Sequence, residues 1–211
     1  TSSLVGSEMC IRDSYNGIDV NNFSPKDDYA QHDVFTCLHI GRFSEQKNHI
    51  EMVLALKKLI DAGEKIRFIF VGEGDLLGDI KEQVDKQHLT KYVIFAGTTG
   101  NVRPWFEKSD LFMLPSKWEG MPMTLIEAMS AAMPIIASNV GGVPDMLENE
   151  RSALLIEPNA DEIVEVILKL KENESLRRSL GQEAYRDSTK FKAEHMGKEY
   201  CNVFNNYPLM R

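Results

Sequence analysis

The chain has 211 residues, which is enough to bury a sizeable core in one large domain. Its 43% hydrophobic and 27% charged residues are typical of an ordinary globular protein. The net charge of -8 argues against a broad nucleic-acid-binding face, so any phosphate-bearing ligand must be bound by local cations and backbone amides. No apolar run approaches the length of a membrane span.

Cysteine and histidine spacing gives no sign of a metal site. The three cysteines are far apart and odd in number, which favours a reduced intracellular compartment over a disulfide scaffold: Cys10, Cys37 and Cys201. The five histidines show no metal-ligand spacing with one another or with the cysteines: His32, His39, His49, His88 and His195. We therefore expect no metal and no cofactor, and a packing role even for His39, which lies on the first expected strand.

The amino-terminal region does not read as part of the core. Residues 1–14, TSSLVGSEMCIRDS, lack clean periodicity and resemble the translated adapter sequence found in some metagenomic assemblies. In that case the true amino-terminal half of the protein is missing. The alternative is that these residues form a native loop or a frayed strand. Residues 15–25 are rich in Asn, Gly, Asp, Ser and Pro, which is turn or linker chemistry.

Strand-like and helix-like patterns then alternate to the end of the chain. Expected strands cover residues 34–40, 66–71, 92–96, 110–114, 135–137 and 153–156. Expected helices cover residues 48–60, 75–87, 161–170, 174–185 and 193–204, with a short helix around Trp105, another after Pro122, and a helical turn after Pro144. This order predicts an α/β fold with a doubly wound, parallel, six-stranded, Rossmann-like sheet.

Glycine-containing loops follow five of the expected strands. They come after Ile40, Val71, Ala96, Leu114 and Ala137, and all fall on the carboxyl edge of the predicted sheet. Ligands collect at that edge in folds of this class. The sequence therefore places a binding site there.

The segment from residue 116 to 138 carries two carboxylates in a loop-to-helix setting. Gly120 allows a turn or a close approach to a ligand, and Pro122 is expected at the first helical position, so that free N–H groups point back into the loop. Such amides attract anions. Glu119 falls in the loop and Glu127 in the helix, so the two carboxylates are expected to bracket one polar ligand.

Two cations follow the first strand. Arg42 offers a forked set of donors to phosphate oxygens and Lys47 a compact charge, so the two are expected to form a diphosphate clamp beside the Gly120 loop. The alternative is that both are solvated or paired with carboxylates, as most strand-end cations are.

Other candidate features are weaker. Gly72-Glu73-Gly74 is not a dinucleotide fingerprint, because the third glycine, Gly78, comes one residue late and the motif follows the second strand rather than the first. A nicotinamide site is rejected on that spacing, although Gly74 is kept as a residue close to a ligand. Trp118, beside Glu119, is the better candidate for stacking on a ligand, and Trp105 is expected in the core.

Taken together, these residues resemble the carboxyl-terminal, donor-binding domain of retaining glycosyltransferases of the GT-B architecture, in family four, also called group 1. The resemblance covers nearly the whole chain after residue 15 and rests on these motifs: Asn16-Gly17-Ile18-Asp19, Phe23-Ser24-Pro25, Gly41-Arg42 with Lys47, Ser116 with Glu119-Gly120, Glu127-Ala128-Met129, Pro134, Gly141-Gly142 and Glu157-Pro158. The glutamate pair with its Gly, Pro and Ala-Met neighbours is a specific signal, whereas the glycine turns alone are not.

The resemblance implies a role for each matching position. Arg42 and Lys47 would hold the donor diphosphate, Glu127 would bind the ribose hydroxyls, and Glu119 would face the donor sugar. Further donor contacts would come from Gly41, Gly74, Gly120, Met121, Pro122, Met123 and Thr124, while Thr98 and Thr99 would meet the nucleobase. We count Glu119, Arg42 and Lys47 as the catalytic set, with Glu119 orienting the donor in a front-face transfer with retention.

Two positions depart from the family pattern. Ala132 stands where glycine is usual, which suggests looser or shifted helix packing, and Asn48 stands where glycine is commoner. Neither change removes a charged contact. No Asp-X-Asp pair is present, so the departing phosphate is expected to be stabilised by cations and helix-end amides without a metal.

The resemblance also implies a domain plan. Residues 1–14 would be non-native or disordered, 15–31 an interdomain linker, 32–190 the donor-binding domain and 191–211 a terminal crossover helix. We expect a hexosyltransferase of polysaccharide or glycolipid biosynthesis. Its expected location is the cytoplasm, and peripheral association with the inner face of the membrane is compatible with that location. Its partners would be a nucleotide sugar and the amino-terminal acceptor domain, which is absent here, so that this piece alone would be inactive.

Alternatives from other classes stay open at this point. A stand-alone nucleotide-sugar-binding module would bind donor without transfer, and a GT-B epimerase would share the same site. A GT-B phosphorylase would need a lysine-anchored pyridoxal site, for which no motif is present. In a purely structural protein, the two cations and both glutamates would merely be solvated.

Overall fold

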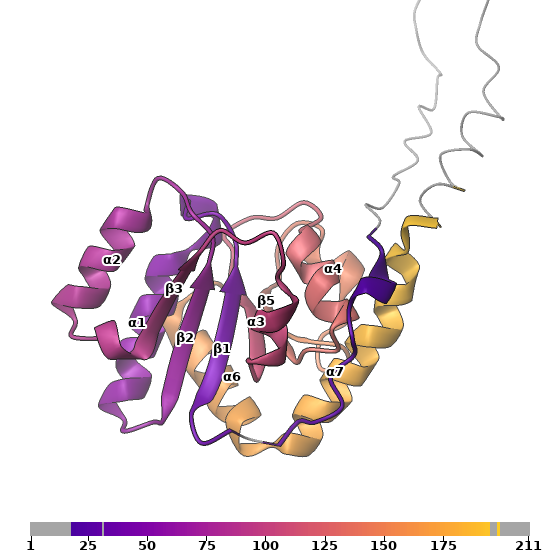
Figure 1. The fold of residues 1–211 in the computed structure, drawn as a ribbon. Helices are drawn as coiled ribbons and strands as arrows, with labels where there is room; N and C mark the ends of the chain where they lie inside the picture. The colour runs from indigo at the N-terminus through magenta and orange to yellow at the C-terminus, as the bar shows by residue number, and fades with distance from the viewer. Residues whose placement is uncertain (1–17, 31, 195–197, 199–211) are drawn as a thin grey trace, which may run out of the picture.

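The computed structural model describes residues 18–30, 32–194 and 198. It confirms the predicted fold: six parallel strands form one sheet in the order β3-β2-β1-β4-β5-β6 (Figure 1). The strands are β1 Phe35–Ile40, β2 Ile66–Val71, β3 Val93–Gly97, β4 Leu111–Leu114, β5 Ile135–Ser138 and β6 Leu154–Ile156. The predictions for residues 1–14 and for most of the 193–204 helix lie outside the described residues.

Helices cover both faces of the sheet. One face packs on α1 His49–Asp61, α2 Leu77–Lys86 and α6 Ala160–Glu172. The other packs on α3 Arg103–Glu107, α4 Met123–Ser130 and α5 Val143–Met146. The long helix α7 Glu174–Ser188 contacts both α4 and α6 (Figure 1). Among the described residues, none of the helices is both long and apolar enough to span a membrane.

The burial of the strands follows from this two-sided cover. All residues of β1, β4 and β5 are buried, and these strands read as continuous runs of mainly apolar side chains rather than as an alternating pattern. That is the pattern of a parallel sheet with helices on both faces. The described residues also form four short 3-10 segments: η1 Val20–Asn22, η2 Glu45–Lys47, η3 Thr90–Tyr92 and η4 Thr189–Phe191.

Part of the predicted linker is fastened to the domain. The hydroxyl of Tyr29 donates to the carbonyl of Ala132 at 2.8 Å. The buried guanidinium of Arg177 donates to the carbonyl of Tyr29 at 2.7 and 3.2 Å, and to Leu170 and Lys171 at the end of α6 at 2.6 and 2.9 Å. A cation that satisfies the free carbonyls of a helix end is favourable on both electrostatic and hydrogen-bonding grounds.

Ala132 and Asn48 stand where the family usually has glycine, and the reason for glycine at both positions is the backbone conformation rather than helix packing. Ala132 has φ 52° and Asn48 has φ 56°, and both lie in the left-handed region that glycine occupies without steric cost. Asn48 tolerates this conformation, and its side-chain amide donates to the carbonyls of Pro115 at 3.1 Å and Pro158 at 2.9 Å. Ala132 has no such compensation from its methyl side chain, so we expect backbone strain at the end of α4.

Candidate functional site

The strand order creates a reversal point at the centre of the sheet. β1 lies beside β4, and the chain runs outward from β1 to β2 and β3 in one direction and from β4 to β5 and β6 in the other. In doubly wound sheets the crevice for ligands opens outside the carboxyl ends of the two strands at such a point. Residues 41–47 follow β1 and residues 115–120 follow β4, so these two loops lie where a crevice is expected in this fold.

A buried ion pair joins these two loops. Lys47 Nζ lies 2.5 Å from Glu119 Oε1, and the two side chains are only 14% and 4% exposed. Gln46 Nε2 donates to the second oxygen of the same carboxylate at 3.3 Å. An ion pair with so little exposure loses hydration and needs further hydrogen bonds to be stable, and the Gln46 amide supplies one of them.

The backbone around Glu119 is packed against the next loop. The N–H of Gly142 donates to the carbonyl of Glu119 at 3.3 Å. A Cβ on Gly141 would lie 1.8 Å from that same carbonyl oxygen, and Gly141 has φ 53°. Only glycine fits here, which gives the Gly141-Gly142 motif a physical reason: it lets the loop after β5 support the loop that carries Glu119.

Arg42 lies in a different environment from Lys47. Its guanidinium is 3.1 Å from the carboxylate of Asp75, and both side chains are mostly exposed. Gly74 lies against the backbone of the same loop, because an added Cβ would be 2.4 Å from the carbonyl oxygen of Phe43. In this structure both predicted diphosphate cations are therefore paired with carboxylates, which is the alternative that the sequence left open.

Two buried histidines, His39 and His49, lie close to Lys47. His39 Nδ1 lies 2.9 Å from the carbonyl of Met113, so Nδ1 carries the proton and donates it. His49 packs edge-on against His39, with ring centroids 4.7 Å apart, and stacks on Phe43 at 4.0 Å. Among the described residues His39 Nε2 and both nitrogens of His49 have no hydrogen-bond partner. The packing role expected for His39 agrees with this environment.

Burial and positive charge keep this pair neutral. Desolvation lowers the pKa of His39 to about 4, against the opposing effect of the Met113 hydrogen bond. Desolvation, together with the neighbouring His39 and Lys47, lowers the pKa of His49 to about 2. A proton on either ring would be both desolvated and close to the ammonium of Lys47.

The second predicted carboxylate, Glu127, lies in a separate hollow. It is half-buried on α4, and desolvation raises the pKa of its carboxyl group. Within the described part of the chain, Glu127 has no hydrogen bond or ion pair from its side chain. The hollow has a volume of about 240 Å³ and is lined mainly by two segments besides Glu127, residues 18–23 and residues 100–103. The two carboxylates therefore do not share a partner.

The loop after β3 borders this hollow. Thr98 and Thr99 are exposed, and the Thr99 hydroxyl accepts from the N–H of Asn101 at 3.1 Å. The Asn101 side chain accepts from the N–H of Arg103, the first residue of α3, at 3.2 Å, and the residue at the helix cap is Val102. These bonds give a loop without regular structure a defined shape next to Glu127.

The start of α4 differs by one residue from the prediction. Pro122 precedes the helix, which begins at Met123. The first amides of α4 still face the loop that contains Gly120, because the first turn of a helix leaves its N–H groups without partners inside the helix. Trp118 is 52% exposed beside Glu119, as a ligand-stacking residue would be, whereas Trp105 is partly buried against the core.

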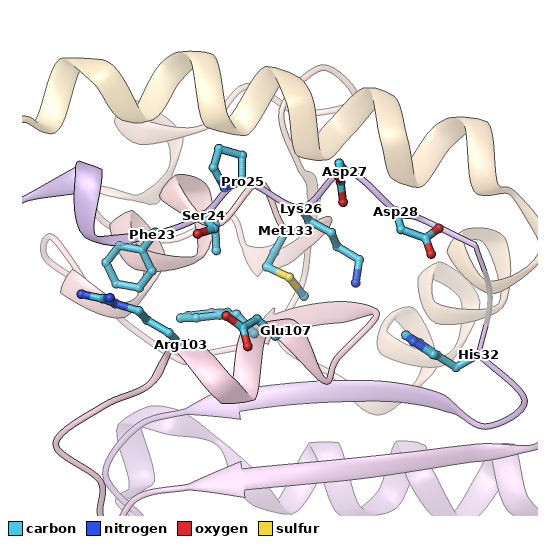
Figure 2. A pocket seen from close by; sticks show the side chains of 12 residues that line it. Phe23, Ser24, Pro25, Lys26, Asp27, Asp28, His32, Arg103, Glu107 and Met133 are labelled. Atoms are coloured by element: carbon cyan, nitrogen blue, oxygen red, sulfur yellow. The ribbon is translucent and has the colours of Figure 1, made fainter.

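A further cavity of about 290 Å³ lies between residues 23–28 and α3. Figure 2 shows Lys26 pointing into it, and Lys26 Nζ donates to the carbonyl of Ser109 at 3.0 Å. His32, at its edge, lies 2.6 Å from the buried carboxylate of Asp110. The lining contains none of the site residues that the sequence indicated. We therefore place the candidate site at the reversal point of the sheet and not in this cavity.

Several residues of the site were not assigned from the sequence. Gln46 contacts Glu119 directly, and Asp19, Asn22 and Arg103 line the hollow with Glu127. Gln46 was signalled only by its position next to Lys47, and Asp19 only by its place in the Asn-Gly-Ile-Asp motif. Among the described residues, no three histidine, cysteine or acidic side chains are grouped so that they could hold a metal ion.

Comparison with known proteins identifies the family. The model of the family "Glycosyl transferases group 1" matches residues 22–187. An Escherichia coli UDP-Gal:alpha-D-GlcNAc-diphosphoundecaprenol alpha-1,3-galactosyltransferase is 30% identical over 192 residues, which cover 80% of this chain and 50% of that protein. A Bacillus anthracis N-acetyl-alpha-D-glucosaminyl L-malate synthase is 28% identical over 82% of this chain and 45% of its own length. The chain thus spans about half the length of these curated relatives.

Solved structures agree on the fold. HepE from Anabaena, in complex with UDP-glucose, superposes with a TM-score of 0.84 at 20% identity, over 92% of this chain and 57% of that chain. The carboxyl-terminal domain of the Francisella tularensis glycosyl transferase group 1 family protein LpcC superposes with a TM-score of 0.73 at 22% identity, over 84% of this chain and all of that domain. With the family model matching most of its length, this chain belongs to the glycosyl transferases group 1 family.

Proposed function

We propose that this chain is the donor-binding domain of a retaining GT-B glycosyltransferase and binds a nucleoside-diphosphate sugar at the reversal point of its sheet. The observation that carries the proposal is the buried Lys47–Glu119 ion pair, which puts a cation and a carboxylate in contact at the position where this fold binds ligands. A phosphate needs the cation, and a sugar needs an acceptor for its hydroxyl groups. The pair offers both within one crevice.

The diphosphate would be held by three sources of positive potential. Lys47 supplies a partly buried ammonium, Arg42 an exposed guanidinium and the start of α4 its free amides. Transfer leaves negative charge on the departing phosphate, and preorganised donors aimed at that charge lower the barrier. These groups perform that task without a metal or another cofactor.

The nucleoside would extend toward the hollow beside α4. A half-buried carboxylate such as Glu127, which has no hydrogen-bond or ion-pair partner among the described residues, can accept hydrogen bonds from two neighbouring ribose hydroxyls, and such bonds would relieve its desolvation. The base would then lie near Thr98 and Thr99, in the loop that forms one wall of the hollow. The binding mode therefore runs from sugar at Glu119 to ribose at Glu127.

Glu119 would orient the donor sugar and stabilise positive charge at its reacting carbon, in a front-face transfer that retains configuration. We assign acceptor binding to a separate domain of the GT-B kind, and transfer of a hexosyl group to the two domains together. This division is consistent with the curated relatives, because the chain matches only about half of their length. We place the enzyme in the cytoplasm, with peripheral association at the inner face of the membrane.

The names of two similar proteins make uracil the first base to test. One relative is named for UDP-Gal and one solved neighbour contains UDP-glucose. Isothermal titration calorimetry with UDP, GDP and ADP, followed by UDP-glucose and UDP-galactose, tests the site and the base together. We expect one nucleoside diphosphate to bind with Kd in the range of about 1 μM to 1 mM, the range of ordinary substrate affinities.

Failure of all three nucleoside diphosphates to bind at millimolar concentration, on a folded sample, would refute the proposal. Hydrolysis or transfer assays with a bound sugar nucleotide then separate the remaining possibilities. Donor binding without turnover is expected of a lone donor-binding domain. Conversion of one sugar nucleotide into its epimer would instead identify an epimerase.

A further inference from the structure

The two loops that border the crevice are fastened to each other by three consecutive residues on each side. In the first pair, the Glu45 carboxylate lies 3.1 Å from Lys117 Nζ, and in the last, Lys47 pairs with Glu119. Between them, the carbonyl of Gln46 accepts from the N–H of Lys117 at 2.8 Å. The η2 turn thus runs alongside the loop that follows β4.

The side chain of Gln46 makes the central contacts of this seam. Its Nε2 donates to the carbonyl of Trp118 at 2.9 Å and to Glu119 Oε2 at 3.3 Å. Both partners are acceptors only, so the amide must present its NH₂ group to them, and its orientation is fixed by chemistry. One amide therefore uses its two N–H groups to hold both the backbone and the carboxylate of the same loop.

This arrangement bears on what happens to Glu119 when a donor binds. Lys47 is the cation that holds Glu119 in this structure, yet a bound diphosphate would draw the same ammonium toward its own charge. Glu119 would then lose its strongest partner at the moment when it must face the sugar. A neutral amide does not compete for the phosphate and does not neutralise the carboxylate.

We propose that Gln46 is a positioning residue: it keeps the Glu119 carboxylate aimed at the donor sugar after Lys47 has turned to the diphosphate. The proposal rests on the donor-binding function put forward above and goes beyond it, because it assigns discrimination between a nucleotide sugar and a bare nucleotide to a residue that touches neither. Gln46 holds Oε2 and the Trp118 carbonyl, which leaves Oε1 of Glu119 for a sugar hydroxyl.

The test compares Gln46→Ala and Gln46→Glu with a matched control, Glu45→Ala. Gln46→Ala removes the two donors. Gln46→Glu keeps the length of the side chain but puts a carboxylate against a carbonyl and another carboxylate. Glu45→Ala breaks the neighbouring exposed ion pair with Lys117 and leaves both contacts of Gln46 in place. Each variant is titrated with UDP and with UDP-glucose by calorimetry.

We expect Gln46→Ala to weaken binding of UDP-glucose about tenfold, the size of one hydrogen bond to a charged group, and to change the affinity for UDP less than about twofold. Gln46→Glu should lose more UDP-glucose affinity than Gln46→Ala, because it adds repulsion. Glu45→Ala should bind both ligands like the wild type. An equal loss for UDP and UDP-glucose, or no loss for either, would overturn the proposal.

A crystal structure of ligand-free Gln46→Ala tests the positioning role of Gln46 independently of the proposed donor binding. We expect Glu119 Oε2 and the Trp118 carbonyl, which lose their amide donor, to shift or to lose order in that variant, while Oε1 stays on Lys47. A loop identical to that of the wild type would refute the positioning role. If the wild type binds neither UDP nor UDP-glucose while the loop does shift, the donor assignment fails and the positioning of Glu119 by Gln46 stands.

Discussion

Two carboxylates of one short segment, Glu119 and Glu127, have opposite surroundings. Glu119 is buried in contact with Lys47 and Gln46, on a loop supported by the glycines after β5. Glu127 is half-buried on α4 and, among the described residues, has no hydrogen-bond or ion-pair partner from its side chain. The first carboxylate is part of the structure before any ligand arrives, whereas the second is free to take a ligand. Substitutions at the two sites should therefore separate stability from binding.

The largest effect is expected on the free energy of unfolding when the Lys47–Glu119 ion pair is broken. Lys47→Ala leaves a carboxylate buried without its cation, and removing one member of a buried pair costs about 3 kcal/mol of the free energy of unfolding. Urea denaturation at neutral pH measures this cost. The double variant Lys47→Met with Glu119→Gln removes both charges and should regain most of the loss. A single substitution that costs less than about 0.5 kcal/mol would show that the pair is no more than a surface salt bridge.

Acid should lower the free energy of unfolding through the two buried histidines near Lys47 and Glu119, which are His39 and His49. His49 has a folded-state pKa of about 2 and an ordinary value of 6.5, so the folded state binds fewer protons than the unfolded chain. The stability that its neutral form contributes is complete above about pH 6.5 and is lost as the pH falls toward 2, at up to about 1.4 kcal/mol per pH unit. His39, at about 4, adds a loss over the upper part of that window.

His49→Phe tests this assignment, since it keeps the stacking on Phe43 and removes two buried ring nitrogens without partners. We expect the free energy of unfolding of this variant to fall less steeply than that of the wild type between pH 6.5 and 4. Urea midpoints measured across that range at constant ionic strength give both slopes. Parallel curves would mean that His49 is not the group that acid protonates on unfolding.

At the Glu127 end the expected effect is on binding. Glu127→Ala should leave the free energy of unfolding within about 0.5 kcal/mol of the wild type, because the side chain has no hydrogen bond or ion pair with the described residues. It should weaken the binding of the nucleoside diphosphate at least tenfold, which is about 1.4 kcal/mol. Calorimetry and urea denaturation give the two numbers. The control is Glu107→Ala on α3, an exposed glutamate at the other cavity, which should change neither. Unchanged affinity in Glu127→Ala would refute the ribose assignment.

The smallest effect is expected where the helix that carries Glu127 ends. Ala132→Gly should raise the free energy of unfolding by about 0.5–1 kcal/mol, because glycine relieves the strain of φ 52° but loses more backbone entropy on folding. The matched control is Ala131→Gly, one residue earlier at φ -83°, which should be destabilising by about 1 kcal/mol. Differences in thermal midpoint between the two variants check the sign. Destabilisation of both variants alike would mean that no strain is stored at Ala132.

By itself, the sequence determined the fold class and indicated the edge of the sheet at which we propose the site. Continuous apolar runs separated by amphipathic stretches predict strands and helices from local patterns, and five glycine loops after strands mark the carboxyl edge. The resemblance marked Asn48 and Ala132 as departures from glycine, but it suggested a packing effect at Ala132, whereas the structure shows left-handed backbone at both positions. The sites assigned to Arg42, Lys47, Glu119 and Glu127 stay predictions until ligand binding is measured.

Only the tertiary structure decided which of these groups touch one another. Contacts between Lys47 and Glu119, and between Gln46 and Trp118, join residues about seventy positions apart, and they exist because β1 and β4 are neighbours in the sheet. No local pattern encodes that adjacency, since it depends on the order in which six strands assemble. The tertiary structure also decided the different surroundings of Glu119 and Glu127, because the first is paired with a residue that follows β1 and the second faces a hollow lined by residues 18–23 and 100–103.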